Sequence, residues 1–143
     1  MSVEVVYAAS STATGGGRDG HVRSADGRID LDTRPPQELG GSGDGTNPEQ
    51  LFSAGYAACF LGALRLVARR NSIGLDDATN VTVDIGLGKD SDTGEFGLVG
   101  TITGYLPGIH QGIADDLMRK SHEMCPYSKA TAGNVAVDIA AKV

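Results

Sequence analysis

The chain has 143 residues, of which 40% are hydrophobic, 5% aromatic and 21% charged, and it contains no tryptophan. This length and composition predict one compact domain over residues 1–143, with a core filled mainly by aliphatic side chains. The formal net charge is −6, and no Lys/Arg cluster is larger than the pair Arg69 and Arg70. Both features argue against nucleic-acid binding, which needs a basic surface.

The sequence also bears on location. Residues 1–17 lack the basic start and the apolar segment of a secretory signal peptide. The longest apolar stretch, residues 51–68, is interrupted by Arg65, and we expect it to be too polar to span a bilayer. We therefore expect a cytoplasmic protein with no membrane partner, in a compartment where disulfides are mostly transient and catalytic.

The sequence of residues 3–32 predicts three strands joined by glycine-rich turns. β-branched and apolar residues predict these strands over residues 3–12, 21–24 and 28–32. Residues 15–20 (GGGRDG) and 25–27 (ADG) have the composition of tight turns. A long irregular connection, rich in proline and glycine, follows over residues 35–45.

A long buried helix is predicted to start at Asn47. This residue is a good N-cap, and Pro48 is favoured at the first helical position. Apolar residues then recur at a spacing of three to four, which is typical of a stripe that faces a core, and the pattern ends near Gly74. The stripe consists of Phe52, Tyr56, Cys59 or Phe60, Ala63 and Val67.

The remaining sequence predicts a hairpin, a second amphipathic helix and a final strand. Alternation of apolar and polar residues predicts strands, and a three-to-four spacing predicts the helix. The expected elements are strands over residues 81–88 and 97–105, a helix over 109–124 and a strand over 134–140. This order predicts an α+β fold with a mostly antiparallel sheet.

Cys59 and Cys125 are the only cysteines of the chain. Cys59 lies in the apolar run AGYAACFLGAL, where we expect a buried helix, whereas Cys125 precedes a proline and therefore sits where a helix must end. A buried thiol and a second thiol at a flexible helix terminus suit an attacking and a resolving sulfur. Taken alone, Cys59 is more typical of a small buried hydrophobe, and Cys125 is equally typical of a helix-terminal spacer.

Arg18 and Glu49 each have two interpretations. Arg18 follows three glycines, where a guanidinium is ordinarily solvated, but such a loop can also bring a fixed charge to a thiol and lower its pKa. Glu49 suits the first turn of a helix as an acidic residue. Alternatively, its carboxylate orients Arg18 by bidentate pairing.

These four residues lie in motifs that resemble a known family. The segment GTNPEQLFSAGYAACFLGAL, the upstream GGRDG and the downstream MCPYSKAT and GN closely resemble the organic hydroperoxide resistance proteins (Ohr) of the OsmC superfamily. The resemblance extends from the strand at Tyr7 to the strand at Asn134, and FLGAL after Cys59 favours the Ohr branch over OsmC itself. Ala132 departs from the pattern, because the family often has a basic residue there.

The resemblance implies a thiol peroxidase that reduces organic hydroperoxides to alcohols. In this family Cys59 would be the peroxidatic thiol and Cys125 the resolving thiol, with Arg18 as the activating cation and Glu49 as its carboxylate partner. The implied fold is OsmC-like, with mostly antiparallel sheets around central helices in an intertwined homodimer and two sites at the subunit interface. The implied reductant is a dithiol, dihydrolipoamide on a lipoylated protein, and no cofactor or metal is implied.

The spacing of Glu49 and Cys59 bears on the dimer. Ten residues of one continuous helix span about 15 Å and about 2.8 turns, so the two side chains would not share a face. Either the helix starts later than Asn47, or Glu49 serves the Cys59 of a second subunit. We therefore expect a composite site.

Because the dipole of a helix does not reach its middle and burial raises a thiol pKa, Cys59 also needs a side-chain cation, for which Arg18 is the candidate.

Apolar side chains near the thiol predict a substrate preference. They are expected to line a pocket that favours bulky organic hydroperoxides over hydrogen peroxide. The expected pocket residues are Leu51, Phe52, Phe60 and Tyr127.

Three alternatives stay open on the sequence alone. The first is a metal-binding module that uses Cys59, Cys125 and some of His21, His110 and His122, although no spacing among them resembles a zinc pattern. For His21 and His110 a simple solvated position is the plainer interpretation. The second is a non-catalytic ligand-binding domain on the same scaffold, with inert thiols. The third is an OsmC-type peroxidase with a broader substrate range.

Overall fold

The computed structural model describes residues 2–143, which group into two compact units. The N-terminal unit extends to Leu51, and the C-terminal unit covers Phe52–Val143. The expectation of one domain over residues 1–143 stays a prediction.

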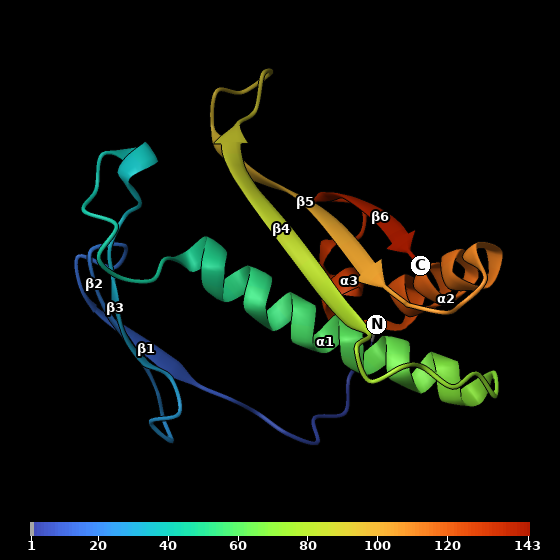
Figure 1. Ribbon diagram of the computed structural model, residues 1–143. Coiled ribbons are helices and arrows are strands. Elements are labelled where there is room, and N and C mark those ends of the chain that lie inside the picture. The colour runs from blue at the N-terminus through green and yellow to red at the C-terminus, as the bar shows by residue number, and fades with distance from the viewer. Residues whose placement is uncertain (1) are drawn as a thin grey trace. The chain divides into compact units, whose positions relative to one another are not determined.

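The N-terminal unit contains an antiparallel sheet in the order β1-β2-β3 (Figure 1). Its strands are β1 (Ser11–Gly15), β2 (Gly20–Ser24) and β3 (Asp30–Thr33), and a short 3₁₀ helix η1 (Gln37–Leu39) follows. The prediction of a strand over residues 3–12 is wrong, because residues 3–10 are exposed and outside any strand. Their β-branched side chains favour extended backbone, but a strand also needs a partner for its hydrogen bonds.

His21 on β2 lies between two carboxylates of β3. Its Nδ1 is 2.7 Å from the Asp32 carboxylate and its Nε2 is 2.5 Å from that of Asp30. The register explains this arrangement, since His21 is directly opposite Asp32 in the antiparallel pair. His21 is partly exposed on a short strand, as predicted, and in addition it has two carboxylate partners.

The C-terminal unit combines a second sheet with helices (Figure 1). Strand β5 (Phe96–Tyr105) pairs antiparallel with β4 (Asn80–Lys89) and parallel with β6 (Ala136–Lys142). Helix α1 (Pro48–Arg70) begins in the N-terminal unit and continues into this one, followed later by α2 (Gln111–Met124) and α3 (Pro126–Thr131). The predicted α+β class with mostly antiparallel pairing is confirmed.

One face of α1 packs into the core of the C-terminal unit with side chains from the sheet and α2. The predicted stripe is confirmed for Tyr56, Phe60, Ala63 and Val67, all of which are buried. Burying each large apolar side chain stabilises the fold by about 1.5–3 kcal/mol. The fully buried large side chains around them include Leu64, Ile102, Leu106, Leu117 and Met118.

Helix ends were predicted less accurately than helix positions. Helix α1 ends at Arg70 and not near Gly74, because Asn71 turns its side-chain amide back to donate to the Val67 carbonyl at 2.8 Å and Ser72 adopts a φ of 55°. At the start of α2, the His110 ring accepts the N–H of Gly112 at 3.2 Å. His110 is thus an N-cap, and it is exposed, as predicted for a solvated residue at a helix start.

Helix α1 also bears on the membrane question. By length and composition alone it is long and apolar enough to cross a bilayer, so the prediction that this stretch is too polar is wrong on those grounds. The core helix of a soluble protein passes the same test. Only one face of α1, which includes Tyr56, Phe60 and Leu64, is fully buried in the C-terminal unit, and about 33% of the apolar window is buried in all.

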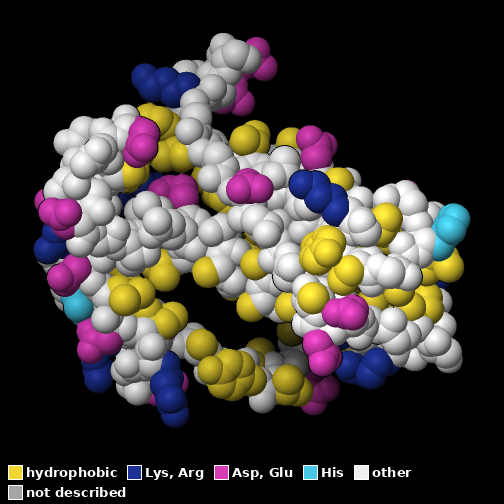
Figure 2. Space-filling model, in the orientation of Figure 1, with side chains coloured by type: hydrophobic (Ala, Val, Ile, Leu, Met, Phe, Trp, Pro, Cys, Tyr) yellow, Lys and Arg dark blue, Asp and Glu magenta, His cyan; other side chains and the backbone are white. Residues whose placement is uncertain are grey.

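The charged side chains do not form one basic surface on the face shown in Figure 2. Lys and Arg side chains lie singly or in small groups among Asp and Glu side chains. This distribution agrees with the negative net charge of the chain.

We expect the stability contributed by His21 to depend on pH. Hydrogen bonds that His21 donates to Asp32 and then to Asp30 raise the pKa of His21 above its ordinary value of 6.5, and His21 lowers the pKa of Asp32 below 3.8. A raised histidine pKa stabilises the folded state below the unfolded pKa, and this contribution is lost as the pH rises through the folded value. His21→Gln should therefore lower the thermal unfolding midpoint more at about pH 5.5 than at about pH 9. Equal losses at both pH values would contradict this.

Candidate active site

The two cysteines lie together in the C-terminal unit, and both are free thiols. The Cys125 thiol donates a hydrogen bond to the Cys59 sulfur, with an Sγ–Sγ distance of 3.6 Å. A disulfide bond is about 2.05 Å long, so a small approach of the two side chains would join them. The burial is the reverse of that predicted, since Cys125 is fully buried whereas Cys59 is partly exposed.

Cys125 is placed by the junction between two helices. A proline disfavours the helical conformation of the residue before it, and Cys125 is accordingly extended, with φ −61° and ψ 124°. Its N–H still donates to the Ser121 carbonyl at 2.8 Å, so α2 ends with its backbone paired. Pro126 then begins α3. The predicted helix end is confirmed, but the predicted flexible terminus is wrong because a second helix follows at once.

The surroundings of Cys59 in the C-terminal unit oppose its ionisation. Burial raises the pKa of the Cys59 thiol, and the neighbouring Cys125 raises it further. The backbone N–H of Tyr127, which donates to the sulfur, acts in the opposite direction. The net pKa is above the ordinary value, so the thiol stays neutral near pH 7 unless a cation acts on it.

A buried network of hydroxyl groups anchors the segment after Cys125. The Tyr56 hydroxyl is 2.9 Å from Ser128 Oγ and 3.2 Å from Thr131 Oγ1, and His122 Nδ1 is 2.8 Å from Ser128 Oγ. These contacts fasten α3 to both α1 and α2. The sequence offered no signal for the network, because Ser and Thr are common near helix starts and their partners lie up to 75 positions away.

Aromatic side chains form a cluster around Tyr127, whose backbone N–H donates to the Cys59 sulfur. Tyr127 packs against Tyr56 and Phe52, with ring centroids 5.6 and 6.2 Å apart. Gly55 permits this approach, since a Cβ there would lie 2.7 Å from the Tyr127 hydroxyl. Of the predicted pocket residues, Phe52 and Tyr127 therefore lie together, with Tyr127 40% exposed.

The other two predicted pocket residues are Phe60 and Leu51. Phe60 is fully buried in the core, with its ring 6.4 Å from that of His122. Leu51 is partly buried and belongs to the N-terminal unit.

The N-terminal unit holds an oriented cation. Arg18 pairs with Glu49 through two parallel hydrogen bonds, Nη1–Oε2 at 3.1 Å and Nη2–Oε1 at 2.8 Å. The Arg18 guanidinium lowers the pKa of Glu49, so this carboxylate stays ionised. Glu49 is in the first turn of α1, and Arg18 is in the turn between β1 and β2. The bidentate geometry fixes the plane of a guanidinium that would otherwise rotate freely on its flexible stem.

The histidines of the metal-binding alternative have other partners. His21 lies between its two carboxylates, His110 caps α2, and His122 is bonded to Ser128. Within residues 2–143, no group of three or more His, Cys, Asp or Glu side chains could hold a metal ion.

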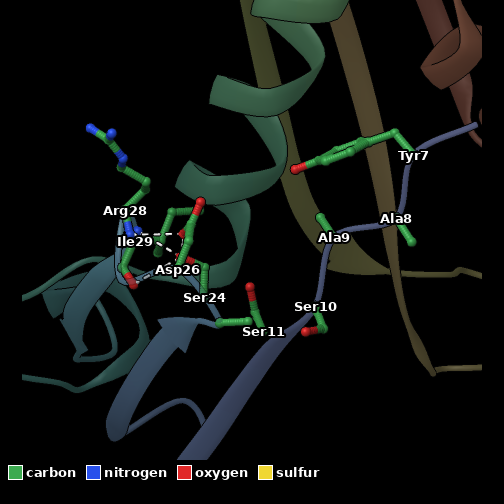
Figure 3. Close-up of a pocket in the computed structure, with 10 residues that line it drawn as sticks. Tyr7, Ala8, Ala9, Ser10, Ser11, Ser24, Asp26, Arg28 and Ile29 are labelled. Carbon is green, nitrogen blue, oxygen red and sulfur yellow. Dashed lines mark hydrogen bonds between the residues drawn. The ribbon is translucent and has the colours of Figure 1, made fainter.

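A separate cavity of about 450 Å³ lies within the N-terminal unit (Figure 3). Its walls come from residues 7–11 and from the turn between β2 and β3. Asp26 accepts from the Ser24 hydroxyl and from the Arg28 N–H, and the Arg28 side chain extends away from Tyr7 and Ala9. The cavity is lined by neither of the two cysteines.

Comparison with known proteins identifies the family. The family model described as OsmC-like protein matches residues 41–140. The organic hydroperoxide resistance protein of Xanthomonas axonopodis pv. citri is 44% identical over 137 residues, which cover 95% of this chain and 94% of the relative.

Solved structures agree with this assignment. A structure from Legionella pneumophila, described as an organic hydroperoxide resistance protein OsmC, has a TM-score of 0.91 at 44% identity and covers 98% of this chain and 100% of the other. The structure of OhrB from Bacillus subtilis has a TM-score of 0.87 at 42% identity, with coverage of 96% and 100%. The chain therefore belongs to the OsmC-like family and is similar over nearly its whole length to organic hydroperoxide resistance proteins.

Proposed function

We propose that this protein is a cysteine-based peroxidase that reduces organic hydroperoxides to alcohols. The observation that carries the proposal is the pair of free thiols whose sulfurs are 3.6 Å apart. Cys59 is the more exposed of the two, as expected of an attacking group, and Cys125 is fully buried. The names of the relatives, organic hydroperoxide resistance proteins, support the same substrate class.

The first step is oxidation of Cys59. Its thiolate attacks the terminal oxygen of R–O–O–H, so that an S–O bond forms, the O–O bond breaks and the sulfur becomes a sulfenic acid. The alkoxide that leaves takes up a proton and departs as the alcohol. The partly exposed position of Cys59 and the neighbouring rings of Phe52 and Tyr127 favour a bulky organic substrate over hydrogen peroxide.

Arg18 supplies the cation that Cys59 requires. A guanidinium does not deprotonate at any physiological pH, so it stabilises both the thiolate and the charge on the departing oxygen. Glu49 holds it in one orientation. Because Glu49 and Cys59 are ten residues apart on the unbroken helix α1, we propose a homodimer in which Arg18 and Glu49 of one subunit serve Cys59 of the other.

The second step is resolution by Cys125. Its sulfur attacks the sulfenic sulfur of Cys59, an S–S bond forms and the oxygen leaves as water. An external dithiol then reduces the disulfide by thiol–disulfide exchange and is itself oxidised to a disulfide. We propose a lipoylated protein as this partner, in the cytoplasm, with neither a metal nor a bound cofactor in the reaction.

Serine substitution should separate the two cysteines. Cys59→Ser should abolish turnover in a lipoamide-coupled assay with an alkyl hydroperoxide, because it removes the attacking sulfur. Cys125→Ser should reduce about one equivalent and then accumulate sulfinic acid, visible by mass spectrometry, because the sulfenic acid has no resolving partner. Full turnover by Cys59→Ser would refute the proposal. Equal rates with hydrogen peroxide in the unmodified protein would instead favour the broader OsmC-type activity.

Removing the guanidinium should raise the pKa of the Cys59 thiol. In Arg18→Met we expect the alkylation rate of Cys59 to begin to rise at a higher pH than in the unmodified protein. Peroxide reduction near neutral pH should fall about 10²-fold. The matched control is Arg28→Met, an exposed arginine of the same unit. An unchanged pH profile in Arg18→Met would contradict the activating role.

A further inference from the structure

The turn that carries Arg18 has little rigidity of its own. It contains Gly15, Gly17 and Gly20, and the first two adopt φ values of 68° and 74°. Such backbone is readily accessible to glycine, and glycine is also the least restricted residue when nothing holds it. A guanidinium placed on this turn keeps a fixed position only if other groups tether the turn.

Arg34 provides one tether by donating from Nη1 to the Gly20 carbonyl at 2.9 Å, and the hydroxyl of Thr33 provides another that reaches both sides of Arg18. Thr33 is on β3 and only 1% exposed. Its Oγ1 donates to the Gly17 carbonyl at 2.6 Å and accepts the Gly20 N–H at 2.9 Å. These two backbone groups flank Arg18 on either side, so one buried side chain holds both ends of the segment that carries the cation.

The backbone around Thr33 is tied to a second segment. Thr33 and Thr46 form a parallel β-bridge, in which the Arg34 N–H donates to the Thr46 carbonyl at 2.8 Å. The Thr46 N–H in turn donates to the Asp32 carbonyl at 2.9 Å. The end of β3 is therefore fastened to the residue that precedes the helix cap.

That cap determines where Glu49 lies. Asn47 follows Thr46 and accepts the Gln50 N–H through its Oδ1 at 2.9 Å, which starts α1. Glu49 is in this first turn. The position of Arg18 and the position of Glu49 are thus both set relative to Thr33, the first through its hydroxyl and the second through its backbone.

We propose that Thr33 is a positioning residue that holds the Arg18 turn in register with Glu49 and thereby sets the reactivity of Cys59. This inference rests on the proposed function, since it acts through the cation assigned there. A buried hydroxyl needs hydrogen-bond partners in any protein. Here both of its partners are backbone groups of the Arg18 turn, which gives the hydroxyl a specific consequence for that arginine.

The test is Thr33→Val, which keeps the shape of the side chain and removes the hydroxyl. Thr33→Ser restores the hydroxyl, and Thr12→Val makes the same change at an exposed position of β1. We expect Thr33→Val to slow the single-turnover reaction with an alkyl hydroperoxide about 3- to 10-fold, as for the loss of one or two hydrogen bonds. The alkylation profile of Cys59 should shift to higher pH, and Thr33→Ser should recover most of both losses.

A double-mutant cycle distinguishes positioning from general destabilisation. If Thr33 acts through Arg18, Thr33→Val should have no further effect on the rate in an Arg18→Met background. The same fold loss in both backgrounds, or an unchanged rate in Thr33→Val alone, would overturn the inference. If Thr33→Val does not fold, Thr33→Ala replaces it in the same double-mutant cycle.

Hydrogen exchange of the turn separates this inference from the proposed function. The backbone amides of residues 17–20 should exchange faster in Thr33→Val than in Thr33→Ser, whether or not the protein reduces peroxides. Faster exchange in a protein without peroxidase activity would support the role of the Thr33 hydroxyl in holding the turn and refute the proposed function. Unchanged exchange would refute the tether even if the peroxidase is confirmed.

Discussion

The chemistry depends on a local backbone constraint at Cys125. Proline at position 126 disfavours the helical conformation at the preceding residue, so α2 stops and α3 starts directly afterwards. The extended Cys125 lies between the two helices, fully buried, with its sulfur 3.6 Å from that of Cys59. Without this break the second thiol would lie on a continuous helix. The proximity of the two thiols is thus a product of chain geometry.

Burying a sulfur pair creates an electrostatic problem, because the same burial that shields Cys59 raises its pKa. A backbone N–H from Tyr127 offsets part of this effect but not all of it. Within the N-terminal unit, Arg18 is held by the ionised Glu49 in a bidentate pair, and in the proposed function this oriented cation offsets the rest of the effect. The sulfur thus lies in an apolar core and the cation on a polar turn, and different segments of the chain carry them.

Local rules predicted the features that depend on neighbouring residues. The Asn47 cap, the stripe on α1 and the helix end at Cys125 each follow from spacing or from proline, and they were confirmed. Features that depend on distant partners were missed. Residues 3–10 have strand propensity but no strand partner, and the bonds of Tyr56 to Ser128 cross 72 positions. The relative burial of the two thiols also depends on packing, which residue composition does not specify.

The hydroxyl network limits how the disulfide can form. Ser128 and Thr131 fasten α3 to Tyr56, and His122 joins the same network from α2. Both segments that flank Cys125 are therefore anchored within a few residues of the sulfur. Moving either helix would break buried hydrogen bonds, which costs more than rotating a side chain about χ1. The closing of the S–S distance is therefore expected to come from rotation of the two cysteine side chains, with the helices as a fixed frame.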